Sequence, residues 1–228
     1  MRRKNLKWID IGCGNGAFTE VLIARCAPAA VTGVDPSEGQ LAYARARPGA
    51  KRAEFRVADA QALPFPDNSF DAATMALVIV FIPDPRMAAR ELVRVVRPGG
   101  VVATYVWEFP DGFPPAPLAA AMKDLGPGTA GAAECTGFGA RCHASDLERS
   151  RAHRDRNRGD PLRVSFSSFA DFWDSNTVPV GPSGKALPEL SPGALEQLKT
   201  RLRERLPIAA DGSISYQAFA NAVMGVVP

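Results

Sequence analysis

Two different hydrophobic periods alternate over the first 107 residues of the chain. The segment from Leu6 to Ile11 is mostly apolar and stops at Gly12, which is typical of a strand that is buried on both faces and then enters a glycine turn. Residues 17–27 carry apolar side chains at helical spacing. The sequence therefore predicts a strand, a glycine loop and a helix as its first structural unit.

The same alternation continues along the chain. We predict further strands at 30–34, 53–57, 72–79 and 101–107. Capping signals predict one helix after Ser37, where Gln40 has capping-box spacing, and another that begins at Asp84-Pro85 and ends at residues 97–100. Alternating strands and helices of this kind form a parallel sheet with helices on both faces.

Beyond Trp107 the pattern becomes less regular. Residues 108–117 contain four prolines and predict a linker. We predict strands at 162–166 and 214–226, and helices at 118–125, from Ser145 onward, at 169–173 and at 195–206.

Acidic residues stand where the predicted parallel strands end. In open α/β sheets, ligands bind outside the carboxyl ends of the strands. Asp10, Asp35 and Asp59 all occupy such positions, as does the segment 76–81. We therefore expect the three aspartates to surround one cleft.

The glycine loop by itself is compatible with more than one ligand. Gly12, Gly14 and Gly16 permit positive φ and a close approach to a ligand, and residues 12–17 also satisfy the GxGxxG/A pattern of dinucleotide-binding proteins. Asp10 distinguishes the alternatives, because its carboxylate would repel a pyrophosphate but attract an ammonium or sulfonium group. The charge favours a cationic ligand.

Asp35 lies about 20 residues beyond the loop, where a carboxylate at the end of the second strand accepts hydrogen bonds from both ribose hydroxyls. We interpret it as a ribose ligand. The alternative is an aspartate that only starts a helix.

Two motifs resemble those of class I S-adenosylmethionine-dependent methyltransferases. Asp10-Ile-Gly12-Cys-Gly14-Asn-Gly16 resembles their acid-x-Gly-x-Gly-x-Gly motif, and Leu63-Pro-Phe-Pro-Asp-Asn-Ser-Phe-Asp71 resembles a second signature of that family. The resemblance implies an α/β, Rossmann-like, doubly wound sheet of seven strands, mostly parallel with an antiparallel last strand, plus a small helical cap. It implies a single domain over residues 1–228, with a cofactor-binding half at 1–107 and a cap and acceptor-side half at 108–228.

The resemblance also implies S-adenosylmethionine as cofactor and methyl transfer as the activity. It assigns Asp59 to the adenine amino group and the backbone of Ala60 to a ring nitrogen. Similarity to the branch that includes quinone-biosynthesis methyltransferases implies a small, apolar or aromatic acceptor. The cofactor-binding residues expected on this basis are Asp10, Gly12, Cys13, Gly14, Gly16, Asp35, Pro36, Asp59, Ala60, Gln61, Ala76 and Phe81.

Two features depart from the family pattern. Family members carry a helical segment before the first strand, whereas only about five residues precede it here, so we expect that either a lid over the cofactor comes from another part of the chain or the protein starts earlier than this sequence. Residues 149–158 are rich in arginine, and we interpret them as a solvated loop rather than an anion site.

Length, composition and net charge limit the classes of protein to which this chain can belong. With 228 residues and 46% hydrophobic content the chain can build one full core. A net charge of +3 is too small to indicate nucleic acid or an anionic membrane as the main partner. The four cysteines have no paired spacing, and the N-terminus resembles neither a signal peptide nor a membrane span. We expect a cytoplasmic enzyme that acts on a small molecule, without nucleic acid binding or membrane insertion.

The remaining candidate residues give little indication of a metal site or of a catalytic side chain. Cys135, Cys142 and His143 lack zinc-ligand spacing, so we expect no metal, and Cys13 lacks a positioned base for a catalytic thiol. His143 and Tyr105 are the only weak candidates for a general base, so the catalytic residues stay unassigned. Several aromatic residues could equally line an acceptor pocket or belong to the core: Trp107, Phe109, Phe113, Phe138 and Trp173.

Two other functions remain open on sequence grounds. One is an NAD-dependent oxidoreductase that uses the same glycine loop. The other is a relative that binds the cofactor but transfers no methyl group.

Overall fold

A computed structural model of the protein describes residues 5–108, 111–125, 161–177 and 186–228. These residues form two compact units. The N-terminal unit comprises residues 5–106 and 221–228, and the helical unit comprises the described residues from 107 to 220. The predicted helix from Ser145, the arginine-rich segment 149–158 and the residues Phe109, Cys135, Phe138, Cys142 and His143 lie outside the described residues.

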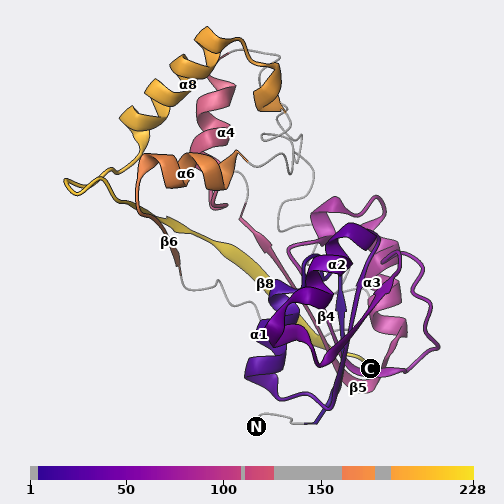
Figure 1. The fold of residues 1–228 in the computed structure, drawn as a ribbon. Helices are drawn as coiled ribbons and strands as arrows, with labels where there is room; N and C mark the ends of the chain where they lie inside the picture. The colour runs from indigo at the N-terminus through magenta and orange to yellow at the C-terminus, as the bar shows by residue number, and fades with distance from the viewer. Residues whose placement is uncertain (1–4, 109–110, 126–160, 178–185) are drawn as a thin grey trace. The chain divides into compact units, whose positions relative to one another are not determined.

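The N-terminal unit contains a six-stranded sheet in the order β3-β2-β1-β4-β5-β8 (Figure 1). Neighbouring strands from β3 to β5 pair in parallel. β8 is antiparallel to β5, since the Gly99 N–H donates to the Val227 carbonyl and the Val227 N–H donates to the Gly100 carbonyl. The strands are β1 Lys7–Ile11, β2 Ala30–Asp35, β3 Ala53–Val57, β4 Phe70–Ala76, β5 Val96–Trp107 and β8 Ala220–Val226.

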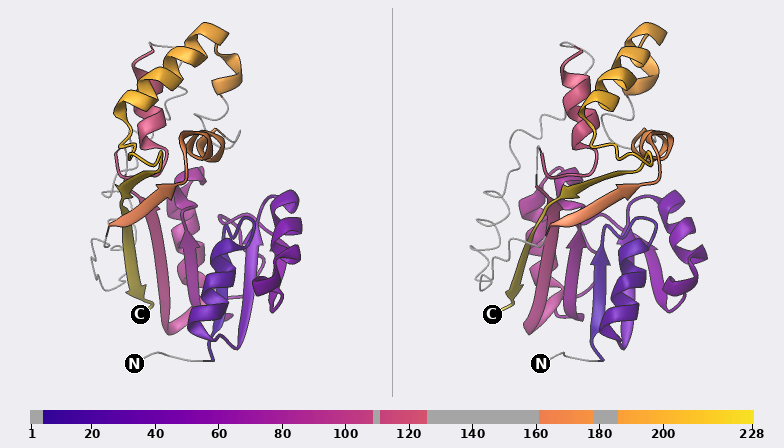
Figure 2. Two further views of the ribbon diagram at one scale, coloured as in Figure 1. Left: turned by 60° about the vertical axis from the view of Figure 1, so that its left-hand side comes forward. Right: turned by 90° about the vertical axis from the view of Figure 1, so that its left-hand side faces the viewer.

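Helices cover both faces of this sheet (Figures 1 and 2). The chain steps from β1 toward β3 in one direction and from β4 toward β5 in the other, so right-handed crossovers place α1 and α2 on one face and α3 on the opposite face. The core between these layers includes Ile9, Ile11, Met75, Leu92 and Val102, all nearly inaccessible to solvent. The helical elements are α1 Ala17–Cys26, α2 Glu38–Ala46, η1 Pro48–Ala50, η2 Ile79–Phe81 and α3 Pro85–Arg94.

Side-chain caps fix where two of these helices begin, as predicted. The Ser37 hydroxyl accepts from the Gln40 N–H at 3.3 Å at the start of α2. The Asp84 carboxylate accepts from the N–H groups of Arg86 and Met87, both at 3.0 Å, at the start of α3. The two capping predictions are therefore confirmed.

The helix predicted from the apolar spacing of residues 17–27 forms, and its apolar side chains are buried to different extents. Leu22 is buried and Phe18 and Cys26 are partly buried, whereas Val21 is 52% exposed. Thr19 takes a buried position on the same helix, which the apolar spacing did not predict.

Two strand boundaries also differ from the prediction. β4 stops at Ala76 rather than residue 79, because Leu77 takes a φ of 58° and its N–H donates to the Tyr105 carbonyl at 2.8 Å. β5 starts at Val96 rather than residue 101, with an irregular register opposite β4 and Gly99 at a φ of 73°. The expected helix-ending turn is therefore a bulged strand start.

The described part of the helical unit combines four helical elements with a two-stranded antiparallel sheet. The helical elements are α4 Ala116–Lys123, α6 Phe169–Asn176, η3 Leu187–Glu189 and α8 Pro192–Arg205. The small sheet pairs β6 Leu162–Phe166 with β7 Ile214–Ala218. Leu118, Phe172, Leu198, Leu202 and Ile214 form the centre of its apolar core.

The prediction of a seven-stranded sheet was wrong. The strand at 162–166 forms, but it pairs with β7 in the separate two-stranded sheet rather than joining the main sheet. The predicted strand 214–226 divides at Phe219 into β7 and β8, because the Phe219 N–H donates to Gly112 and its carbonyl accepts from Glu108. The antiparallel orientation of the last strand was predicted correctly.

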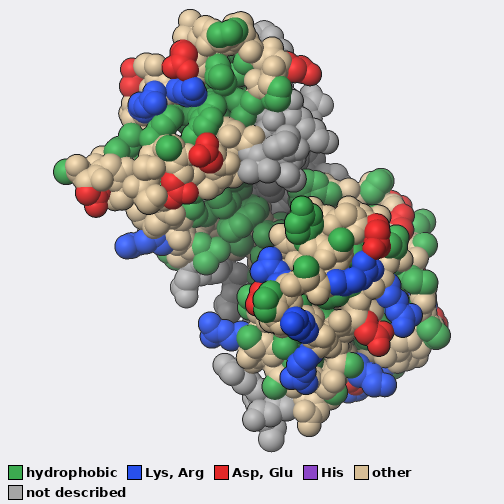
Figure 3. Space-filling model, in the orientation of Figure 1, with side chains coloured by type: hydrophobic (Ala, Val, Ile, Leu, Met, Phe, Trp, Pro, Cys, Tyr) green, Lys and Arg blue, Asp and Glu red, His purple; other side chains and the backbone are tan. Residues whose placement is uncertain are grey.

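None of the helices in the described ranges is long and apolar enough to cross a membrane. On the face shown in Figure 3, Lys and Arg side chains are scattered, with acidic side chains among them. Several charged side chains of the described residues form ion pairs, such as Arg47 with Glu20 at 2.9 Å.

Candidate functional site

The loop between β1 and α1 brings three glycines with positive φ to the carboxyl edge of the sheet. The φ angles are 70° at Gly12, 52° at Gly14 and 77° at Gly16. A Cβ on Gly12 would lie 2.7 Å from the Val78 Cβ and closer still to a Val78 methyl group, whereas a Cβ on Gly14 would meet nothing within 4 Å. Gly12 is thus required by packing, and Gly14 faces open space where a ligand can approach the backbone.

Asp35, the last residue of β2, is tied directly to this loop. Its Oδ2 accepts from the Gly14 N–H and its Oδ1 accepts from the Ser37 N–H, each at 2.9 Å. The side chain is nearly buried, so both oxygens are fixed in orientation. Each carboxylate oxygen can accept a second hydrogen bond, which suits a pair of vicinal hydroxyls. Pro36, also a predicted site residue, follows at an exposed position.

Asp10 lies under the loop, on β1, and is completely buried. Its carboxylate accepts from the Thr19 hydroxyl at 2.6 Å and from the Thr74 hydroxyl at 3.3 Å. Burial raises the pKa of Asp10 from 3.8 to about 6, although the two hydroxyl groups act in the opposite direction. The Asp10 side chain has no exposed surface in this structure, so it cannot contact a ligand directly. Its negative charge can influence a ligand at the loop only electrostatically, across the backbone that lies between them.

The segment after β3 carries Asp59, Ala60 and Gln61. The Ala58 N–H donates to the Asp35 carbonyl at 3.3 Å, which brings the ends of β2 and β3 together. Asp59 is exposed, and its Oδ1 accepts from the Gln61 N–H at 2.8 Å. Asp10, Asp35 and Asp59 thus lie at one edge of the sheet, on or directly after three adjacent strands.

Comparisons with known proteins relate part of this chain to a described family. Residues 9–104, which include β1 to most of β5, match the family described as the methyltransferase domain. This match covers less than half of the chain.

Individual relatives cover the domain to different extents. Demethylmenaquinone methyltransferase from Clavibacter sepedonicus is 40% identical over 118 residues, which is 51% of this chain and 46% of that protein. The matched region spans between 36% and 46% of the length of the curated relatives that it matches, which is less than half.

Solved structures share the fold at low sequence identity. YcgJ from Bacillus subtilis has a TM-score of 0.62 at 18% identity, covering 98% of this chain and 92% of its own. Phosphoethanolamine N-methyltransferase 2 from Haemonchus contortus, solved with S-adenosylhomocysteine, has a TM-score of 0.56 at 20% identity, covering 99% of this chain and 49% of its own. These similarities show that the chain has a Rossmann-like fold.

The structure places the other predicted residues of the N-terminal unit at the same edge. Ala76 ends β4 and pairs with Tyr105 on β5. Phe81 lies in η2 just beyond β4 and is 72% exposed. Cys13 is buried in the glycine loop, and burial, followed by the charge of Asp10, raises the pKa of its thiol. This thiol therefore stays protonated at neutral pH and is a poor nucleophile.

Sequence analysis missed the two threonines that bind Asp10. Thr19 stands three residues after the last loop glycine, and Thr74 pairs with Asp10 in the register between β1 and β4. A hydroxyl on the first turn of the helix was a visible signal for Thr19. No comparable signal existed for Thr74, because the register of two strands 64 positions apart depends on the tertiary fold.

Tyr105 is a poor general base in this setting. Its ring centroid lies 5.7 Å from that of Phe18, and burial, then the charge of Asp10, raises its pKa above the usual value of 10. The phenol is therefore protonated at neutral pH and can act only as a hydrogen-bond donor or acceptor. Among the described residues, no group of three or more His, Cys, Asp or Glu side chains could hold a metal ion.

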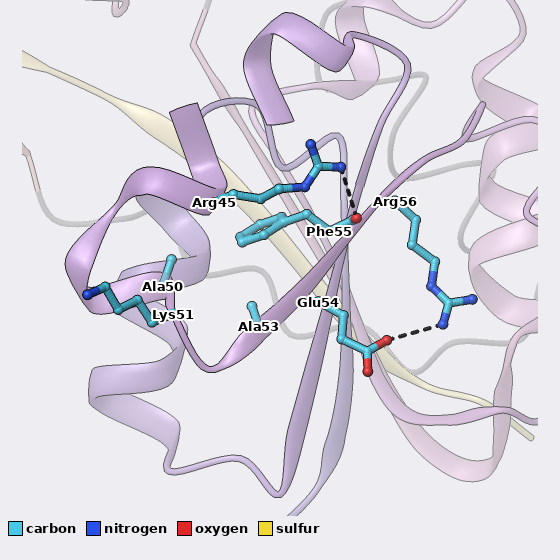
Figure 4. A pocket seen from close by; sticks show the side chains of 7 residues that line it. All are labelled: Arg45, Ala50, Lys51, Ala53, Glu54, Phe55 and Arg56. Atoms are coloured by element: carbon cyan, nitrogen blue, oxygen red, sulfur yellow. Dashed lines mark hydrogen bonds and ion pairs between the residues drawn. The ribbon is translucent and has the colours of Figure 1, made fainter. Parts of the chain in front are cut away.

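A surface hollow of about 460 Å³ lies elsewhere on the N-terminal unit, beside β3 (Figure 4). The two arginines that line it are already engaged: Arg45 pairs with Glu38 and donates to the Phe55 carbonyl, and Arg56 pairs with Glu54. Phe55 and Arg45 lie together, while the ion pair of Glu54 and Arg56 points away from them (Figure 4). The hollow contains none of the predicted site residues, so it is not the candidate site.

Of the aromatic residues considered for an acceptor pocket, Trp173 packs against the core of the helical unit. Its ring stacks on Phe169 with a centroid distance of 6.3 Å, and the Lys199 ammonium lies 5.3 Å from its centroid. Within the helical unit, this residue therefore has a packing role.

Proposed function

We propose that this chain binds S-adenosylmethionine at the carboxyl edge of β1, β2 and β3 and transfers its methyl group to a small, apolar or aromatic acceptor. The observation that supports this most strongly is the direct link between Asp35 and the loop, through the Gly14 N–H at 2.9 Å. That link fixes a ribose-binding carboxylate beside an open stretch of glycine backbone. The methyltransferase family matched by residues 9–104 supports the same activity.

Each aspartate has a separate role in the proposal. Asp35 accepts hydrogen bonds from the ribose hydroxyls, and Asp59 accepts one from the adenine amino group. Ala60 binds the adenine ring through its backbone. Asp10, buried beneath the loop, provides negative charge on the side where the ammonium group of the cofactor would lie. A dinucleotide pyrophosphate is disfavoured there by the same charge.

The chain needs no nucleophile of its own for this reaction. S-Adenosylmethionine supplies an already activated methyl group when it is bound. The side chains therefore have to hold the adenosyl group in one orientation and exclude water, so that the acceptor atom, the methyl carbon and the sulfur are aligned. The protonated state of Tyr105 fits an acceptor that carries its own nucleophile or loses its proton to solvent.

The acceptor class rests on the relatives. Demethylmenaquinone methyltransferase is the name carried by a 40% identical protein. We propose an acceptor with an aromatic or quinol-like ring. This acceptor is a small molecule and not a site on the surface of a larger partner.

Calorimetry tests the cofactor assignment. Wild-type protein should bind S-adenosylmethionine and S-adenosylhomocysteine but not NAD. Asp35→Ala should weaken binding by about 1–3 kcal/mol, as expected for lost hydrogen bonds to a charged group. Asp174→Ala, which removes an exposed aspartate of the helical unit, is the matched control and should bind as the wild type does. Binding of NAD alone would contradict the proposal.

Methyl transfer is tested separately. The protein is incubated with S-adenosylmethionine and a panel of quinols, catechols and other small aromatic molecules, and the products are identified by mass spectrometry. We expect a product heavier by one methylene group together with S-adenosylhomocysteine. Tight cofactor binding without any product across the panel would instead indicate a relative that binds the cofactor and does not transfer the methyl group.

A further inference from the structure

The side chain of Gln61 joins Asp59 to the start of α3. Its Nε2 lies 3.2 Å from Asp59 Oδ1 and 3.1 Å from Asp59 Oδ2, so the amide donates to the carboxylate. Its Oε1 accepts from the Asp84 backbone N–H at 2.9 Å. Since Nε2 faces an acceptor and Oε1 faces a donor, the hydrogen bonds define which end of the amide is which.

The backbone reinforces the same contact. The Gln61 N–H donates to Asp59 Oδ1 at 2.8 Å, and the Ala62 N–H donates to the Asp59 carbonyl at 3.1 Å. The backbone N–H of Gln61 orients one carboxylate oxygen, while its side-chain amide reaches both. Asp59 is exposed, so without these donors its carboxylate could rotate freely in water.

The segment that follows is anchored to the same helix. Glu91 on α3 accepts from the Leu63 N–H at 2.7 Å. Arg94, one turn later, donates to the carbonyls of Leu63 and Phe65 at 3.0 Å and 2.8 Å, and pairs with Glu91 at 2.6 Å. These bonds hold residues 63–65 against the C-terminal part of α3, while Gln61 holds the preceding residues against its N-terminus. Gln61 therefore connects the exposed carboxylate of Asp59 to the start of α3 and holds the carboxylate in a defined position relative to that helix.

We infer that Gln61 is a positioning residue for recognition of the adenine base: it holds the Asp59 carboxylate in the orientation that accepts from the 6-amino group. This inference rests on the proposed function, in which Asp59 binds that amino group. It assigns Gln61 an indirect role, through Asp59, in addition to any contact of its own with the cofactor. The chemical group it selects is a purine with a 6-amino donor.

The test compares two ligands on two proteins. The ligands are S-adenosylhomocysteine and its analogue with hydrogen in place of the 6-amino group. Gln61→Met keeps the length of the side chain and the backbone N–H, but removes the amide. Wild-type protein should prefer S-adenosylhomocysteine by roughly tenfold, as expected for one hydrogen bond to a charged group. In Gln61→Met this preference should fall to about twofold or less, while the affinity for the analogue stays near the wild-type value.

The ratio of the affinities for the two ligands distinguishes a positioning role of Gln61 from a general structural role. A merely structural role for Gln61 would weaken both ligands equally and leave their ratio unchanged, which would overturn the inference. In the background Asp59→Ala, adding Gln61→Met should cause no further loss of preference, because the two residues act as one unit. Independent, additive effects would also overturn it.

Two further variants keep the test decisive. Gln61→Glu retains an oxygen that can accept from the Asp84 N–H but replaces the donor to Asp59 with a like charge, so the preference should be lost there too; this variant also serves if Gln61→Met does not fold. Gln197→Met, at an exposed position in α8, is the control and should keep the wild-type preference. If the wild type binds neither ligand, the proposed function itself fails, whereas normal wild-type preference with a normal Gln61→Met ratio refutes only the role of Gln61.

Discussion

The two units of the chain use their interiors for different purposes. Among the described residues, every polar side chain that is buried lies in the N-terminal unit, and three of them, Asp10, Thr19 and Thr74, form one network beneath the glycine loop. The central cluster of the helical unit consists of apolar and aromatic side chains such as Phe172 and Leu198. Although both threonines donate to Asp10, burial still raises the pKa of this carboxyl group, so its charged form lowers the stability of the N-terminal unit.

The largest expected effect is that of Gly12→Ala in the N-terminal unit. The new Cβ would overlap Val78, and the residue would have to keep a φ of 70°. We expect a loss of about 3 kcal/mol or more in the free energy of unfolding and a loss of measurable S-adenosylhomocysteine binding. Denaturant unfolding and calorimetry measure the two effects.

Gly212→Ala is the control for Gly12→Ala. It imposes a φ of 83° on alanine in the helical unit, where the Cβ would meet nothing within 4 Å. We expect a cost of about 1 kcal/mol from backbone strain alone, with unchanged cofactor affinity. If Gly12→Ala were no worse than Gly212→Ala, the packing of the loop against Val78 would not matter, and the contrast between the units would be lost.

Leu198→Ala tests whether a large loss of stability in the helical unit leaves cofactor binding unchanged. Leu198 is completely buried in the apolar cluster on α8. Its truncation should lower the free energy of unfolding by about 3 kcal/mol through lost burial and the cavity left behind. The affinity for S-adenosylhomocysteine should not change in conditions where the protein stays folded. A large loss of affinity would show that the helical unit contributes directly to cofactor binding.

Asp10→Asn should separate stability from function within the N-terminal unit. The folded-state pKa of about 6 is higher than the usual 3.8, so the folded protein binds this proton more tightly than the unfolded chain does. The contribution of Asp10 to stability therefore rises as the pH falls from about 6 to about 4, and its charged form is unfavourable above that window. A shift of about two units in the pKa of Asp10 corresponds to a cost of at most about 3 kcal/mol in the free energy of unfolding when the carboxylate is charged.

Asn cannot ionise and can still hydrogen-bond to both threonines. We therefore expect Asp10→Asn to be more stable than the wild type at pH 8, with the advantage vanishing near pH 4, and to bind S-adenosylhomocysteine about tenfold more weakly at neutral pH. Thermal unfolding at the two pH values and calorimetry give the answer. A variant that is less stable than the wild type by the same amount at both pH values would contradict the assigned cost of burying Asp10.

The same contrast explains how far the sequence could be interpreted. The strand at 53–57 appears with the predicted bounds, and the helices capped by Ser37 and Asp84 begin where predicted, because local turn and capping chemistry determines these features. Asp10, Asp35 and Asp59 were placed at one edge by the alternation of strands and helices alone. Their contacts with the cofactor remain predictions.

What the sequence could not reveal depends on pairing between distant segments. The division of the strand 214–226 at Phe219 follows from hydrogen bonds to residues 108 and 112, more than 100 positions away. Thr74 reaches Asp10 only through the register of β4 against β1. The amide of Gln61 bonds to Asp84, 23 positions later, through the docking of α3. No local period or motif encodes these contacts.

The smallest expected effect compares one chemical feature in both units. Ser37 caps α2 by accepting from the Gln40 N–H, and Ser191 caps α8 by accepting from the Ala194 N–H at 3.2 Å. Replacing either serine with alanine should cost about 1 kcal/mol of stability. Cofactor affinity should stay unchanged in Ser191→Ala and nearly unchanged in Ser37→Ala, because Asp35 binds the backbone N–H of residue 37 rather than its hydroxyl. If Ser37→Ala instead weakened S-adenosylhomocysteine as strongly as Asp35→Ala does, the orientation of Asp35 would depend on the cap, and the hydrogen bond from the backbone would not suffice to fix it.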